Sequence, residues 1–445
     1  MKLRDIAIGA NASMYYRMNF KNIKGVYYPH NEQEIVDAIS KAREKGYGVT
    51  AKGGGSGLSG ACTGGNRDRV MISSLQMRDV LTISKDQGYL DVQPGATPDE
   101  INELLAPMKM KFFVAPSSRD IATVGGILST DGGGNDTWTN GTMRDNTQRV
   151  KMVLYDGRKL TVSWNGVTSD DSDLEAELNR HKMTIHDVAS SHGTLGFISE
   201  LRVTIKPLQT KPMVGGIVHY SDNDEAGRAL GQIIERKIPV EYGEVIAAAH
   251  EDVRGDLKPP LHILEGTEDA MEQISEIVAL KRLPKEEVDH MKDVRIKLPK
   301  RQPSVGHQVA LFEGYGFHGD SLSKMQEGID EVNALLRRHE FEPFAKYGHG
   351  PSKWYIGDNS PTYGIILHSR EIRPENKPGK EIYQTVLDIV ELCKRLNITP
   401  KPEHKWPFSD EVKMARLSEI RSIIGSGFNS FLLDSDCNET LASMV

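Results

Sequence analysis

The spacing of hydrophobic and polar residues near the start of the chain predicts a helix that leads into a strand. Asn31 can cap this helix, with Glu34 three residues later. The apolar residues that recur on one helical face are Ile35, Ala38, Ile39 and Ala42. Gly46 ends the predicted helix, and residues 47–52 are typical of a strand. A glycine-rich run follows directly, so the predicted order is helix, strand and glycine loop.

The same patterns predict further strands and turns as far as residue 207. Residues 69–73 and 89–93 are strand-like. Residues 97–100 have the sequence of a capping box, with proline at the first helical position. Residues 150–162 are typical of a β-hairpin.

Beyond residue 207, strands and amphipathic helices alternate, which favours an α+β region. We expect strands at 215–220, 240–249, 307–313 and 363–370. We expect helices at 223–236, 267–280, 321–339 and 379–396. Residues 281–304 are rich in Lys, Arg and Pro, so we predict that they form an exposed connector.

Composition and charge narrow the class of protein. The chain has 445 residues, of which 38% are hydrophobic and 26% charged, which excludes a disordered chain and an integral membrane protein. The longest purely apolar run is 245–249, whereas a membrane helix needs roughly 20 residues. The net charge of −7 gives no general attraction to nucleic acid. For that reason a small-molecule substrate is expected. Three scattered cysteines and the lack of a secretion signal indicate a cytoplasmic protein.

Glycine is concentrated in two short windows, residues 53–65 and 125–141, which hold 13 of the 42 glycines. Such clusters weaken packing, so they indicate a backbone that approaches a ligand closely. Residues 55–60 match the G-x-G-x-x-G pattern, but no helix pattern follows, so a Rossmann site is not supported. A P-loop is excluded because no Lys-Ser/Thr pair follows the glycines. The first loop is therefore predicted to be a nest of N–H groups for a diphosphate.

Four sequence blocks, in this order, resemble the FAD-binding (PCMH-type) domain of the vanillyl-alcohol oxidase and p-cresol methylhydroxylase fold, most closely its glycolate oxidase and D-lactate dehydrogenase branch. The blocks are KGGGSGLSG at 52–60, PSS with ATVGG at 116–126, GTMRDN at 141–146 and SHGTLGFI at 191–198. The resemblance covers residues 25–207.

This resemblance implies non-covalent FAD, because Ser56 stands where members with covalent flavin have a histidine. It also implies the cofactor contacts. They are Lys52, Gly53, Gly54, Gly55, Ser56, Gly57, Leu58, Ser59, Pro116, Ser117, Ser118, Thr123, Gly125, Gly126, Arg144, Asp145, Asn146, Gly196 and Ile198. His192 departs from the branch, which usually has glutamate there, and we interpret it as a tolerated change.

The fold class implied is α+β, with a two-subdomain FAD-binding domain followed by an α+β, ferredoxin-like cap domain. We expect an N-terminal helical segment at 1–24, the FAD domain at 25–207, the cap at 208–400, and a C-terminal segment at 401–445 that completes the active site.

Oxidation of a 2-hydroxy acid requires a base for the hydroxyl proton and a cation for the carboxylate. His368 and Arg370 are two residues apart on a predicted strand and would face the same side. Glu403 and His404 partly match the Gly-Glu-His-Gly motif of the branch, although the following glycines are missing. These four residues are the candidate catalytic set. A divalent metal held by His368, Glu403 and His404 is possible but not favoured, and His318 and His349 are interpreted as turn residues that serve as second candidates.

The sequence therefore predicts a soluble FAD-dependent oxidoreductase that takes a hydride from a 2-hydroxy acid or related alcohol. The electron acceptor is unknown, and a homo-oligomer is possible. Two alternatives stay open: an alkyl transferase of the ether-lipid synthase type on the same fold, and a non-catalytic flavin-binding electron-transfer subunit.

Overall fold

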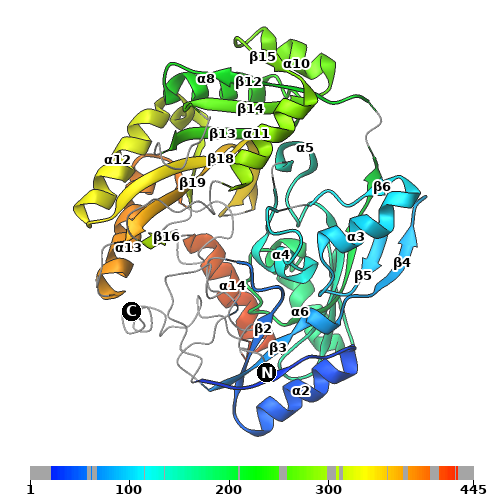
Figure 1. The fold of residues 1–445 in the computed structure, drawn as a ribbon. Helices are drawn as coiled ribbons and strands as arrows, with labels where there is room; N and C mark the ends of the chain where they lie inside the picture. The colour runs from blue at the N-terminus through cyan, green and yellow to red at the C-terminus, as the bar shows by residue number, and fades with distance from the viewer. Residues whose placement is uncertain are drawn as a thin grey trace.

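The structure is a computed structural model of the chain, with two lobes that face each other (Figure 1). It describes residues 22–57, 62, 68–114, 116–134, 136–208, 211–249, 258–297, 307–309, 314–357, 359–373, 379–400, 410–425 and 427–428. We call residues 22–208 the N-terminal lobe and residues 211–400 the C-terminal lobe. The predicted helical segment at 1–24 lies almost entirely outside the described residues.

A small parallel sheet in the N-terminal lobe carries the first glycine loop. Its order is β1–β3–β2, where β1 is Ile23–Tyr27, β2 is Gly48–Lys52 and β3 is Arg69–Ser73. Helix α2, Glu32–Glu44, buries the four predicted apolar residues, and the Asn31 side chain accepts a hydrogen bond from the Glu34 amide. The predicted order of helix, strand and glycine loop is confirmed.

A six-stranded antiparallel sheet forms the rest of the N-terminal lobe, in the order β4–β5–β10–β7–β8–β9. The strands are β4 Val80–Ser84, β5 Tyr89–Val92, β7 Thr147–Val153, β8 Lys159–Ser163, β9 Gly166–Ser169 and β10 Phe197–Thr204. The helices are α3 Pro98–Leu105, α4 Val124–Thr130, α5 Thr137–Asn140, α6 Ser172–Arg180 and α7 Ile185–Val188. The capping box at Thr97 and Glu100 and the hairpin of β7 and β8 are confirmed.

The two lobes are joined after a short two-stranded sheet, in which β6 Met110–Lys111 pairs with β11 Lys206–Pro207. The short 3-10 helices of the N-terminal lobe are Ser74–Gln76 and Ala106–Met108.

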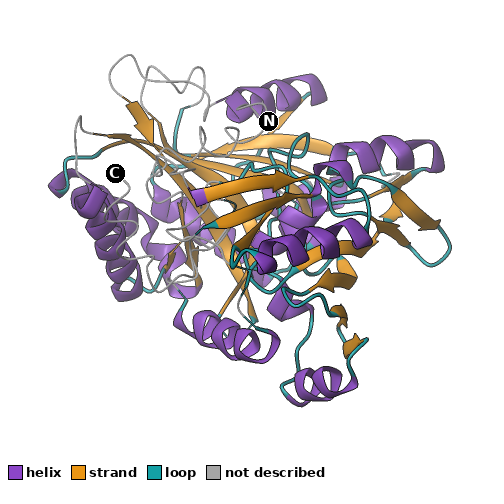
Figure 2. Cartoon of the chain, turned by 90° about the horizontal axis from the view of Figure 1, so that it is seen from below, coloured by secondary structure: helices purple, strands orange, loops and turns teal. Residues whose placement is uncertain are grey.

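The C-terminal lobe contains a nine-stranded antiparallel sheet. Figure 2 shows the chain from below, with the strands in orange and the helices around them in purple. The order is β15–β12–β14–β13–β18–β19–β17–β20, with β16 also paired to β19. The strands are β12 Val214–His219, β13 Val240–Ala249, β14 Leu261–Gly266, β15 Lys281–Leu283, β16 His307–Val309, β17 Gly314–His318, β18 Glu342–Ile356, β19 Ser360–Arg373 and β20 Thr399–Pro400. The expected α+β character is confirmed.

Four helices pack on one face of this sheet: α8 Asn223–Glu235, α10 Glu268–Ser275, α12 Met325–Arg338 and α13 Gly379–Arg395. A 3-10 helix, Gly319–Lys324, precedes α12. Val245 and Leu367 on the strands share a core with Leu230, Val332 and Ile389 on these helices. The opposite face carries Ile246, Ile263 and Tyr347, which pack with Val288 of α11.

Within residues 281–297, the described part of the segment 281–304, the described side chains are mostly exposed as predicted, but the expectation of a connector is wrong because the segment forms regular structure. Lys281–Leu283 pairs with β12, and Lys285–Lys297 forms helix α11. Val288 is fully buried, while Lys285 lies 2.8 Å from the Glu265 carboxylate. The segment has few apolar residues, so it packs through Val288 and through ion pairs that a hydropathy pattern does not show.

Helix α14, Glu411–Ile424, returns from the end of the chain to the N-terminal lobe. Its Leu417, Ile420 and Ile424 are buried in the core that also contains α6. Phe428 forms a parallel bridge with Val49 of β2. The N-terminal lobe is thus completed by residues more than 200 positions after its last strand.

Candidate functional site

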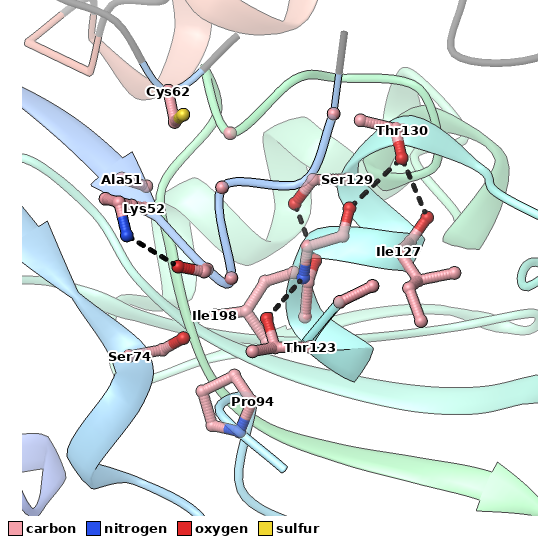
Figure 3. Close-up of a pocket in the computed structure, with 18 of the residues that line it drawn as sticks. Ala51, Lys52, Cys62, Ser74, Pro94, Thr123, Ile127, Ser129, Thr130 and Ile198 are labelled. Carbon is pink, nitrogen blue, oxygen red and sulfur yellow. Dashed lines mark hydrogen bonds between the residues drawn. The ribbon is translucent and has the colours of Figure 1, made fainter. Parts of the chain in front are cut away.

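A deep pocket lies in the N-terminal lobe between the first glycine loop, α4 and the segment before β10 (Figure 3). It contains about 890 Å³ of space, part of it open to solvent, which is within the usual size of a cofactor site. Its lining residues are Ala51, Lys52, Gly53, Gly54, Gly55, Ser56, Gly57, Cys62, Ser74, Pro94, Pro116, Ser118, Ala122, Thr123, Gly125, Gly126, Ile127, Ser129, Thr130, His192, Gly193, Gly196, Phe197 and Ile198.

The glycines of the first loop are required by close packing as well as by the pocket. A Cβ atom on Gly53 would lie 2.3 Å from the Thr123 hydroxyl oxygen, and one on Gly54 would lie 1.8 Å from the Ile121 carbonyl oxygen. A Cβ on Gly57 would meet no atom of the described residues within 4 Å. The loop therefore lies against the segment 121–126 at its start and opens into free space at its end.

The second glycine cluster opens helix α4, which the sequence analysis did not predict. Thr123 caps the helix by accepting a hydrogen bond of 3.4 Å from the Gly126 amide. Ser129 donates to the Gly125 carbonyl over 2.8 Å, as Figure 3 shows. A Cβ on Gly125 would lie 2.7 Å from Pro94, so glycine is needed there although it disfavours helix. The signal available in the sequence was Thr123 as a cap before a short apolar run.

The structure brings together most of the residues predicted to contact the cofactor. Those that line the pocket are Lys52, Gly53, Gly54, Gly55, Ser56, Gly57, Pro116, Ser118, Thr123, Gly125, Gly126, Gly196 and Ile198. Leu58 and Ser59 lie outside the described residues. Ser117, Arg144, Asp145 and Asn146 are described but do not line the pocket, so their contact with a cofactor stays a prediction.

His192 and Cys62 also line the pocket, and neither was among the predicted cofactor contacts. The His192 side chain is almost fully buried, and its backbone is held in the left-handed region at φ 54° by a hydrogen bond to the Ser129 carbonyl. Burial raises the pKa of the Cys62 thiol, so this cysteine is a poor nucleophile at neutral pH.

In the C-terminal lobe, the structure places His368 beside His349. His368 is on β19 and His349 on the neighbouring β18, and their Nε2 atoms are 3.4 Å apart. Behind them, the Nδ1 atom of His349 lies 3.3 Å from the carboxylate of Glu244, a fully buried residue of β13. The interpretation of His349 as a turn residue is wrong, because it lies within a long strand. Glu244 was missed, although a lone acid inside the apolar strand 240–249 was a visible signal.

The other predicted catalytic residues are only partly placed. The backbone of Arg370 lies in β19, and its side chain is outside the described part of the structure. Glu403 and His404 are also outside the described residues. His318 ends β17, and its ring centroid is 6.0 Å from that of Trp354.

One segment of the N-terminal lobe connects the pocket to the sheet that carries the two histidines. Its first part, α4, lines the pocket, and its second part, α5, contacts β13 and β18. Trp138 donates a hydrogen bond of 2.7 Å to the Ile238 carbonyl, and Thr139 donates one of 2.8 Å to the Val240 carbonyl. Burial raises the pKa of Asp136, at the start of α5, although Lys111 opposes this.

Within the described ranges, no group of three or more His, Cys, Asp or Glu residues could hold a metal ion. Among the same residues, no helix is both long and apolar enough to cross a membrane.

Curated proteins match up to about half of the chain. D-lactate dehydrogenase of Archaeoglobus fulgidus is 24% identical over 215 residues, which are 48% of this chain and 46% of that protein. Glycolate oxidase subunit GlcD of Escherichia coli is 25% identical over 48% of this chain and 40% of that protein. D-2-hydroxyglutarate dehydrogenase of Pseudomonas putida is 31% identical over 28% of this chain and 12% of that protein. The chain thus spans less than half the length of each of these relatives.

Solved structures resemble the chain over a larger part. Alkyldihydroxyacetonephosphate synthase aligns with 91% of this chain and 76% of that chain, with a TM-score of 0.64 and 14% identity. A second crystal form of that synthase gives a TM-score of 0.63 and 15% identity. At this identity the likeness establishes a shared fold. Residues 23–163 match the family model described as an FAD binding domain, so this part of the chain is an FAD-binding domain and FAD is its cofactor.

Proposed function

We propose that the protein is an FAD-dependent oxidoreductase that transfers a hydride from the hydroxyl-bearing carbon of a 2-hydroxy acid or related alcohol to non-covalently bound FAD. One observation carries the proposal. Helix α5, which follows the pocket-lining helix α4, contacts β13 and β18, and these strands carry Glu244 and His349, the latter also in contact with His368. The curated relatives named as dehydrogenases or oxidases of hydroxy acids support the substrate class.

The pocket fits an FAD molecule because the glycines of its first loop have no side chains, which lets a diphosphate approach the backbone amides. We propose that the amides of Gly53 to Gly57 hold the diphosphate, and that the other predicted residues of the lining hold the ribityl and adenosine parts. Lys52 supplies the positive charge, and its ammonium lies 3.3 Å from the Gly53 carbonyl. Bound FAD supplies the hydride acceptor.

The histidine pair is proposed to take the hydroxyl proton of the substrate. Glu244 attracts a proton to Nδ1 of His349, which leaves Nε2 of His349 as an acceptor. Nε2 of His368 can then donate to it, so Nδ1 of His368 keeps a lone pair for the substrate. Arg370 is proposed to bind the carboxylate, and Glu403 and His404 to complete the site.

The arrangement of the C-terminal lobe supports a more specific description of the cap. When β12, β13, β14 and β15 are numbered 1 to 4 along the chain, they lie in the order 4-1-3-2 across the sheet. Strands β17, β18, β19 and β20, numbered in the same way, lie in the mirror-image order 2-3-1-4. This order, with helices after the first and third strands, is that of a β-α-β-β-α-β ferredoxin-like unit. We therefore propose a cap built from two such units, and domains at 25–207, 208–400 and 401–445.

The proposal is tested by reducing the flavin without oxygen. D-lactate, glycolate and D-2-hydroxyglutarate are each added anaerobically, and flavin absorbance near 450 nm, about where oxidised flavin absorbs, is followed. Bleaching by any of them supports the function. FAD that stays oxidised with all three contradicts it and favours the alkyl transferase or the electron-transfer subunit. The electron acceptor is then found by reoxidation with candidate acceptors, and the oligomeric state by light scattering.

The few cysteines support a reducing compartment such as the cytoplasm.

We predict that acid precipitation will release all of the flavin as FAD. Ser56 has no imidazole to bond to the flavin ring, so nothing at that position can hold the cofactor covalently. The measurement is the absorbance of the supernatant and pellet, followed by chromatography against FAD and FMN standards. A yellow pellet would contradict the prediction, and released FMN would contradict the diphosphate site.

We also predict that a chelator will not lower the rate of flavin reduction. Both ring nitrogens of His349 are already engaged in the proposed scheme, Nε2 by His368 at 3.4 Å and Nδ1 by Glu244 at 3.3 Å, which leaves no lone pair of His349 for a metal. Wild-type protein is dialysed against EDTA, and the reduction rate is compared with that of untreated protein. Loss of activity, restored by Zn²⁺ or Mn²⁺, would show that a metal acts with His368.

A further inference from the structure

The tip of the hairpin formed by β18 and β19 is docked on the loop of residues 141–146 in the N-terminal lobe. Lys353 and Tyr355 of β18 both contact one carboxylate oxygen of Asp145, the lysine at 2.8 Å. At the turn of the hairpin, Asn359 accepts a hydrogen bond of 3.1 Å from Arg144. The two lobes are therefore joined through side chains of adjacent residues in one short loop.

The Asp145 carboxylate is fully engaged by protein groups. While Oδ1 accepts from Lys353 and Tyr355, Oδ2 accepts from the Thr142 amide over 2.8 Å. Burial raises the pKa of Asp145, but the hydrogen bonds from Lys353 and Tyr355 outweigh it, so the pKa lies below its ordinary value. A Cβ on Gly141 would lie 2.4 Å from Oδ2, and its φ of 77° favours glycine. The loop is thus shaped to hold this carboxylate.

Arg144 also contacts residues of the C-terminal lobe at this junction. Its side chain is 1% exposed, and its Nε donates to Asp131 over 2.6 Å. The guanidinium also lies 4.2 Å from the centre of the Tyr355 ring. Both Arg144 and Asp145 therefore point to the hairpin, and neither lines the cofactor pocket.

The docked strand is the one that carries His349, four residues before Lys353. The loop belongs to the segment whose earlier part, α4, lines the cofactor pocket. One segment therefore touches the cofactor site at one end and fixes the histidine-bearing strand at the other.

We propose that Asp145 is a positioning residue that sets the place of His349 and His368 relative to the bound flavin, through Lys353 and Tyr355. The inference rests on the proposed function and gives Asp145 a role different from the predicted cofactor contact. Misplacing a reacting group by about 1 Å can cost roughly 100-fold in rate. A defect in positioning should therefore slow the reaction more than it weakens binding.

The experiment compares D145N with the control D156N in the full-length protein. D156N, like D145N, removes an ion pair, in this case with Arg158 at 2.7 Å. Asp156 lies in the turn between β7 and β8 of the N-terminal lobe, away from the junction of the lobes. Three quantities are measured: the Kd for FAD, hydrogen exchange of peptides from β18 and β19, and anaerobic flavin reduction by the best of the three acids.

For D145N we expect a Kd for FAD within about twofold of wild type, and exchange in the hairpin at least about tenfold faster. We expect a reduction rate constant roughly 10- to 100-fold lower, with the half-saturating acid concentration changed by less than about threefold. D156N should match wild type in all three. A merely structural loss would instead lower FAD content and thermal stability together.

A Kd raised at least about tenfold with unchanged hairpin exchange would overturn the proposal and return Asp145 to the cofactor site. Unchanged exchange with an unchanged rate would overturn it as well. If none of the acids reduces the wild-type flavin, the proposed function fails. In that case, hydrogen exchange of the β18 and β19 peptides is the measurement that decides whether Asp145 holds the hairpin in place.

Discussion

Replacing His368 with asparagine is expected to slow anaerobic flavin reduction by roughly 10²–10⁴-fold while FAD content stays at the wild-type level. The side chain lies in the C-terminal lobe, beside His349 and outside the pocket lining, so its loss removes a proton acceptor and no cofactor contact. H349N should have an effect in the same direction, because it removes the group that orients His368. Stopped-flow absorbance at saturating acid measures both.

The matched control for these variants is H219N. His219 is an exposed residue of β12, which is separated from β18 by β14 and β13 in the same sheet. The H219N variant should therefore reduce its flavin at the wild-type rate. Wild-type rates in both H368N and H349N would contradict the proposed proton transfer and direct attention to His404 and His318. The FAD-binding assignment would be unaffected, because it does not depend on this lobe.

Gly57→Asp is expected to weaken FAD binding by roughly 100-fold or more, because it places a negative charge beside the diphosphate. No atom of the described part of the chain lies within 4 Å of a Cβ at this position, so the protein should still fold. The Kd for FAD is measured by titrating apo protein and following flavin fluorescence. Full FAD content in the purified variant would contradict the diphosphate site.

Gly57→Ala separates charge from size and should bind FAD nearly as well as wild type. By contrast, Gly54→Asp should fail to fold as well as to bind, since even its Cβ would overlap the Ile121 carbonyl. Thermal unfolding with and without FAD distinguishes these cases. A hundredfold excess of ligand over its Kd stabilises the folded state by about 2.7 kcal/mol, and Gly57→Asp should lose this increment only.

The sequence was most informative where local spacing determines structure. The cap at Asn31, the strand before Gly53 and the capping box at Thr97 are all local signals, and the structure has them as expected. The glycine clusters also indicated the pocket, because a backbone that approaches a ligand excludes side chains whatever the distant contacts are.

The candidate catalytic group could be predicted only in part, since it depends on the pairing of strands. His349 and His368 are 19 residues apart and meet because β18 and β19 form a long hairpin. Glu244 reaches them because β13 pairs with β18, in a register that aligns Glu244 with His349. No local pattern encodes that register, so the sequence placed His368 in the candidate set, named His349 only as a second candidate and missed Glu244.

The return of α14 and Phe428 to the N-terminal lobe has a consequence for how the protein is made. Domains generally fold in order as the chain leaves the ribosome, the first one before the next is complete. Here the first lobe lacks three buried residues of its core and a neighbour of β2 until residues 417–428 have been synthesised. Its final packing must therefore wait until residues 417–428 have left the ribosome, so stable capture of FAD is expected only after the C-terminal lobe has been synthesised.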